Sequence, residues 1–89
     1  MTRKHFTAIA NILAGQFASA SSPAEKLAIW TTTLSLAQYF KSENSNFSYD
    51  RFYLAVFGTE DHFAVRDAAV RANNNYVAAR YADARRTEV

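Results

Sequence analysis

The sequence of 89 residues contains no cysteine, a single proline and only two glycines. Without cysteine the chain has no disulfide bond, no thiolate ligand for zinc and no cysteine nucleophile. Gly15 and Gly58 are too far apart to form a glycine-rich phosphate-binding loop. His5 and His62 lie on different predicted elements and match no metal-binding spacing. We therefore expect no metal, no cofactor and no enzymatic activity.

A strong charge imbalance and a long hydrophobic run are also missing. Ten Lys and Arg residues against eight Asp and Glu residues give a formal net charge of +2. No apolar stretch reaches the roughly 18–20 residues that cross a membrane. The basic N-terminus and the apolar residues up to Ala20 superficially resemble a signal peptide, but Asn11 and Gln16 interrupt this stretch. We expect one domain, residues 1–89, located in a cytoplasm and without a membrane partner.

Aromatic residues, by contrast, are abundant at 15% of the chain, and most of them lie between Tyr39 and Phe63. A chain this short needs large side chains to build a core, so we interpret the cluster mainly as core. The alternative is that some of the tyrosines are exposed and bind a protein, because tyrosine is enriched at interfaces. Tyr49 and Tyr53 are the candidates for this role.

Helical periodicity predicts an all-α domain of four to five helices. The first helix covers about residues 2–19. The second begins with Ser22-Pro23-Ala24-Glu25, a capping box in which the Ser22 hydroxyl accepts the Glu25 amide and the Glu25 carboxylate accepts the Ser22 amide. This helix extends to about Lys41 and carries Trp30 in its apolar stripe.

Two further helices are predicted in the second half of the chain. A short one is capped by Ser48 and reaches Phe57, and Gly58 is well placed to adopt the left-handed conformation that ends it. The last begins near residues 59–61. The run Asn73–Asn75 either breaks it or lies within one long helix, and the register of its small apolar residues favours the long helix.

The last predicted helix also carries a basic end formed by Arg80, Arg85 and Arg86. The arginines of this helix are distributed around its axis and acidic residues lie among them, whereas a helix that reads a DNA groove concentrates its basic residues on one face. These three arginines are therefore candidate binding residues, and DNA binding is the weaker of the two functional hypotheses.

The segment from Asn44 to Gly58 reads N-S-N-F-S-Y-D-R-F-Y-L-A-V-F-G. It resembles the N-x-x-F-x-x-x-R-F-x-x-A-x-G segment of small proteins encoded by mycobacteriophages and other actinobacterial phages, although two residues and not one separate Ala55 from Gly58 here. Residues 2–10 resemble their usual start, and the resemblance covers about residues 2–58. It implies a phage origin and a small size but no particular activity. The motif residues are interpreted as a folding signature with a capped turn, a buried Phe pair and a glycine stop: Asn46, Phe47, Arg51, Phe52 and Gly58.

These observations together predict a non-enzymatic phage accessory protein in the host cytoplasm. It would act by protein–protein interaction, either with a host factor or as a homo-oligomer. The alternative is a small DNA-binding regulatory protein, for which nucleic acid would be the partner.

Overall fold

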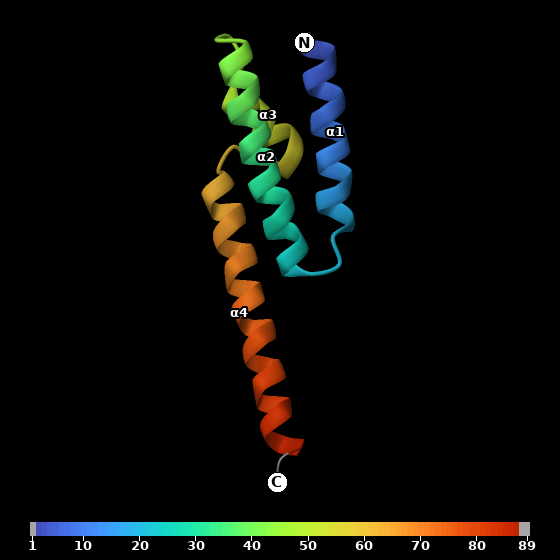
Figure 1. Cartoon of the computed structure of the whole chain (residues 1–89), viewed down its shortest axis with the longest axis vertical. Helices are drawn as coiled ribbons and strands as arrows, with labels where there is room; N and C mark the ends of the chain where they lie inside the picture. The colour runs from blue at the N-terminus through green and yellow to red at the C-terminus, as the bar shows by residue number, and fades with distance from the viewer. Residues whose placement is uncertain (1, 88–89) are drawn as a thin grey trace.

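The computed structural model in Figure 1 describes the backbone of residues 2–87 and the side chains of residues 2–75. This part of the chain contains helices and no strand, so the all-α prediction is confirmed for it. The helices are α1 (Arg3–Ser19), α2 (Pro23–Glu43), α3 (Tyr49–Phe57) and α4 (His62–Thr87). The backbone stays helical through Asn73–Asn75, as the register of the small residues favoured.

The short helix α3 and the central helix α2 organise the packing. α1 and α2 lie side by side in opposite directions, as Figure 1 shows. α3 packs chiefly on α1, α4 packs chiefly on α2, and both α2 and α3 contact each of the other helices. Within the described residues, no helix combines the length and the apolar character needed to cross a membrane.

The start of α2 differs in one detail from the predicted capping box. The Ser22 hydroxyl accepts the Glu25 amide at 3.2 Å, as expected. The Glu25 carboxylate, however, accepts the backbone amide of Ser21 at 2.8 Å and the Ser21 hydroxyl at 2.9 Å instead of the Ser22 amide. Ser21 offers two donors where Ser22 would offer one, and these bonds hold the pKa of the Glu25 carboxyl below its ordinary value.

Local signals also explain the limits of α3. The Ser48 hydroxyl accepts the Arg51 amide at 3.3 Å. At the other end Gly58 has φ 76°, and its amide donates to the Leu54 carbonyl at 2.9 Å. A side chain at this left-handed position would be strained, which is why glycine ends the helix here.

The core is largely aromatic. Phe52 lies almost perpendicular to Phe40, with ring centroids 5.6 Å apart, and packs 5.4 Å from Phe47. Such edge-to-face contacts add to the free energy gained by burying the rings. The buried core residues are Ala10, Leu13, Ala37, Phe40, Phe47, Phe52, Tyr53 and Val56. Much of the aromatic excess of the sequence is therefore core.

A second aromatic contact joins α2 to the beginning of α4. The indole nitrogen of Trp30 donates to the His62 carbonyl at 2.8 Å, and the two rings stack with centroids 6.1 Å apart. The Arg66 guanidinium lies 5.9 Å from the centre of the Trp30 ring. Trp30 thus fixes the position of α4 relative to α2.

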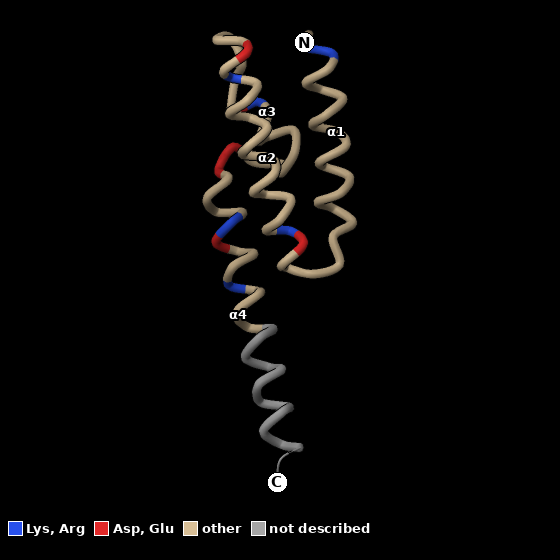
Figure 2. Tube along the Cα trace, in the orientation of Figure 1, with Lys and Arg blue, Asp and Glu red and all other residues tan. Residues whose placement is uncertain are grey.

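Charged residues contribute little to this packing. Figure 2 shows basic and acidic positions interspersed along the described part of the helices. The Asp67 carboxylate lies 3.7 Å from the guanidinium of Arg66, which also lies over the Trp30 ring. Both side chains of this pair are at least half exposed, so its contribution to stability is small.

Candidate functional site

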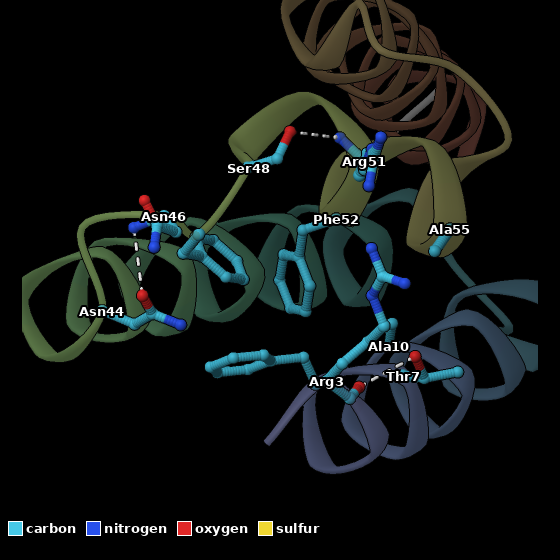
Figure 3. A pocket seen from close by; sticks show the side chains of 11 residues that line it. Arg3, Thr7, Ala10, Asn44, Asn46, Ser48, Arg51, Phe52 and Ala55 are labelled. Atoms are coloured by element: carbon cyan, nitrogen blue, oxygen red, sulfur yellow. Dashed lines mark hydrogen bonds between the residues drawn. The ribbon is translucent and has the colours of Figure 1, made fainter. Parts of the chain in front are cut away.

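A hollow of about 480 Å³ lies between α1, α3 and the loop that connects α2 to α3, as Figure 3 shows. We call it the α1–α3 groove. Its volume falls within the range of about 300–1,000 Å³ that is typical of ligand-binding pockets. The groove is therefore large enough to receive side chains of a partner molecule.

The floor of the α1–α3 groove consists of phenylalanine rings. Phe47 and Phe52 are only 7% and 4% exposed, and Phe6 is half-buried. Phe6 and Phe47 meet edge to face with centroids 5.1 Å apart. Because the rings pack against one another, they form a fixed support whose flat faces are mostly covered.

Two arginine side chains, Arg3 and Arg51, line the groove together with these rings. Arg3 is the first residue of α1, Arg51 is in the first turn of α3, and both are exposed. Figure 3 shows Arg3 extending from α1 towards α3, where Arg51 begins. Among residues 2–75, no carboxylate lies within 4 Å of either guanidinium. The α1–α3 groove therefore carries two positive charges that no described acidic group neutralises.

Two polar side chains at the edge of the groove, Asn44 and Ser48, use an acceptor internally. The Asn44 carboxamide oxygen accepts the Asn46 amide at 3.0 Å, and the Ser48 hydroxyl accepts the amide of Arg51. Lys41 donates to the carbonyls of Ser45 and Phe47 at 2.8 and 3.0 Å, which fixes the loop between α2 and α3. These bonds leave the Asn44 NH₂ group and the Ser48 hydroxyl hydrogen as donors beside the two guanidinium groups.

The structure corrects one of the two tyrosine predictions. Tyr53 is only 6% exposed, because its ring packs 4.5 Å from that of His62 and stacks between Tyr49 and Phe57. Burial raises the pKa of the Tyr53 hydroxyl, and the neighbouring Tyr49 and Asp50 add to this shift. Tyr53 is thus a core residue without the exposed surface that a contact needs, whereas Tyr49 is half-buried.

The other predicted residues lie in three places. Arg80, Arg85 and Arg86 lie outside the residues whose side chains the structure describes. Phe47 and Phe52 form the floor of the α1–α3 groove. Ser22, Glu25, Trp30 and Gly58 lie at helix ends or at the contact between α2 and α4.

From the sequence, Arg51 was interpreted as part of the folding signature and Arg3 was not singled out, whereas both are exposed and line the α1–α3 groove. A weak signal was present, since neither arginine has an Asp or Glu three or four residues away with which it could pair along its own helix. That the two arginines share one groove depends on the packing of α1 against α3.

A second hollow, of about 410 Å³, lies between the turn after α1 and the small residues of α4. It has a single cationic side chain, Lys26, which already lies over the Phe17 ring at 5.6 Å. It therefore offers a partner less free charge than the α1–α3 groove does.

Among residues 2–75, no three His, Asp or Glu side chains gather where they could hold one metal ion. Comparisons of the chain with protein-family models, with curated proteins and with solved structures find no match. The α1–α3 groove is therefore interpreted from its own residues.

Proposed function

We propose that this protein is a non-enzymatic phage accessory protein that acts by protein–protein interaction through the α1–α3 groove. The observation that carries the proposal is the pair of exposed arginines, Arg3 and Arg51, over a floor of packed phenylalanine rings. Arginine is enriched among the residues that dominate binding energies at protein interfaces. The proposed phage origin rests on the resemblance of residues 2–58, and the proposed cytoplasmic location rests on the interruption of the N-terminal apolar stretch by Asn11 and Gln16.

The groove supports a protein partner better than DNA. A DNA-binding face needs a series of basic residues that follows the phosphates, whereas in Figure 2 acidic positions lie beside the described basic positions of α2 and α4. Binding to single-stranded nucleic acid relies on exposed aromatic faces, whereas Phe47 and Phe52 are buried. Both observations favour recognition of a protein.

The test is capture of a partner from host lysate with the wild-type protein and two tryptophan variants. Ala55→Trp places a large ring in the α1–α3 groove, which exposed Ala55 lines. Ala28→Trp adds the same ring at an exposed position of α2 outside the groove. We expect a protein that the wild type and Ala28→Trp retain equally and that Ala55→Trp loses.

Two results would contradict this proposal. One is equal retention of the captured protein by both tryptophan variants, which would place the contact elsewhere. The other is recovery of the bait alone together with a monomer in solution, because either a host partner or self-association is required. Retention on duplex DNA that persists at moderate salt would favour the DNA-binding alternative.

A further inference from the structure

We propose that the α1–α3 groove recognises an acidic segment of the partner protein and binds Asp or Glu carboxylates with Arg3 and Arg51. This inference rests on the proposed function and adds the chemistry of the partner to it. It is argued from the charges that face the groove, from its free hydrogen-bonding groups and from the shape of its floor.

The charged side chains that line the groove favour an acidic ligand. Arg3 and Arg51 come from different helices, and no described carboxylate lies within 4 Å of either guanidinium. Asp50 is the neighbour of Arg51 in sequence, but it does not line the groove. Because both guanidinium groups line the same groove, a ligand that carries negative charge there is attracted by both.

The hydrogen-bonding groups of the polar side chains in the groove also bear on the chemistry of its ligand. Thr7 donates its hydroxyl hydrogen to the Arg3 carbonyl at 3.0 Å, so the Thr7 side chain offers a ligand only an acceptor. The Asn44 carboxamide oxygen accepts the Asn46 amide, which leaves the Asn44 NH₂ group to donate. The Ser48 hydroxyl accepts a backbone amide and retains its own hydrogen. Together with the guanidinium groups, these donors match a ligand rich in acceptors.

The guanidinium groups and the apolar floor of the groove fit the two parts of an acidic side chain. The guanidinium fork presents parallel N–H groups that fit the two oxygens of a carboxylate. Beneath it, the apolar floor of Phe6 and Phe47 and the methyl group of Ala55 suit the aliphatic stem of an Asp or Glu side chain. An acidic peptide supplies both parts, the carboxylate and the apolar stem.

The experiment is a titration of the ¹⁵N-labelled full chain, followed by its amide signals. The probe is an acetylated and amidated nine-residue peptide in which three Glu alternate with Leu and Ala. A matched peptide carries Gln in place of each Glu, and inorganic phosphate at the same ionic strength is the third ligand. We expect the Glu peptide to move the amide signals of Thr7, Asn46 and Arg51, and the Gln peptide to leave them in place.

Two double variants separate this site from general attraction between opposite charges. Arg3→Gln with Arg51→Gln removes two positive charges from the groove, and Lys4→Gln with Arg71→Gln removes two exposed charges that do not line it. The first should weaken binding of the Glu peptide by about tenfold or more, and the second by less than about twofold. All four residues are exposed, so unchanged signals elsewhere in the spectrum will show that both variants fold.

The inference is overturned if the wild type binds the Glu and Gln peptides equally well, or if the two double variants lose the same affinity. Movement of the groove signals by phosphate but not by the Glu peptide would also overturn it and would identify a phosphate site. These outcomes are independent of the lysate capture. If Ala55→Trp still loses the captured protein, binding through the groove stands and only the acidic chemistry of the partner fails.

Discussion

We predict that Phe52→Ala, a truncation in the aromatic core, removes a large part of the free energy of unfolding. The Phe52 ring is 4% exposed and meets two other buried rings, those of Phe40 and Phe47, at centroid distances of 5.6 and 5.4 Å. Truncation would leave a cavity at the centre of the contacts between α1, α2 and α3, beneath the groove.

The magnitude follows from the burial of the ring and its contacts. Replacing a buried Phe by Ala costs about 3–5 kcal/mol of unfolding free energy. The two ring contacts, each worth about 0.5–1.5 kcal/mol beyond the buried area, place Phe52 at the upper end of that range. A domain of this length has a total stability of roughly 4–13 kcal/mol, so the variant is expected to be marginally folded.

The assay is equilibrium unfolding in urea, followed by the fluorescence of Trp30, the only tryptophan of the chain, and by circular dichroism. The midpoint for Phe52→Ala should fall by at least about 1 M urea. Phe63→Ala is the control, because that ring is 62% exposed and its removal should cost less than about 1 kcal/mol. Equal losses in the two variants, or a loss below about 1 kcal/mol for Phe52→Ala, would refute the assignment of the core.

Three further predictions concern the backbone and the two perturbed ionisable groups. Gly58→Ala should destabilise the fold by about 1–2 kcal/mol because Gly58 has a φ of 76°, and Gly15→Ala, within α1, should stabilise it by about 0.5–1 kcal/mol. At both positions the added Cβ meets no atom within 4 Å, so only the backbone conformation separates the two effects. Urea midpoints that move in the same direction in the two variants would contradict this. The lowered pKa of Glu25 means that its bonds to Ser21 stabilise the fold above the ordinary pKa of 4.5 and that this stabilisation is lost as the pH falls below it. The melting temperatures of the wild type and Glu25→Gln should therefore converge towards pH 3. A difference in melting temperature that stays constant with pH would count against the bonds. The raised pKa of Tyr53 means that its stabilising effect is complete below pH 10 and is lost as the pH rises further. Just above pH 10, the melting temperature of Tyr53→Phe should therefore fall less steeply with pH than that of the wild type. Identical dependence of the two melting temperatures on pH would disprove the effect.

The helix ends were predictable because their signals are local. Ser22 and Ser48 each accept an amide three residues ahead, and Gly58 ends α3 with a positive φ. These interactions depend only on residues within one turn of the chain. The helical period likewise predicts the buried side of α1, where Ala10 and Leu13 are almost completely covered.

The features that the sequence did not resolve depend on contacts between distant segments. Tyr49 and Tyr53 are one helical turn apart on α3, and the difference in their burial arises because His62, at the start of α4, covers Tyr53. The α1–α3 groove depends on the same kind of contact, since Arg3 and Arg51 lie far apart in the sequence. Periodicity assigns residues to a face but does not say which other element covers that face.

The central claim is that the α1–α3 groove is the surface at which this protein contacts its partner. The most direct measurement is photo-crosslinking in the host, with a benzoylphenylalanine side chain introduced in place of Ala55 within the groove or in place of Ala28 on α2. We expect a discrete crosslinked adduct from position 55 and none from position 28. An adduct from position 28 alone, adducts of equal yield from both positions, or none from position 55 would contradict it.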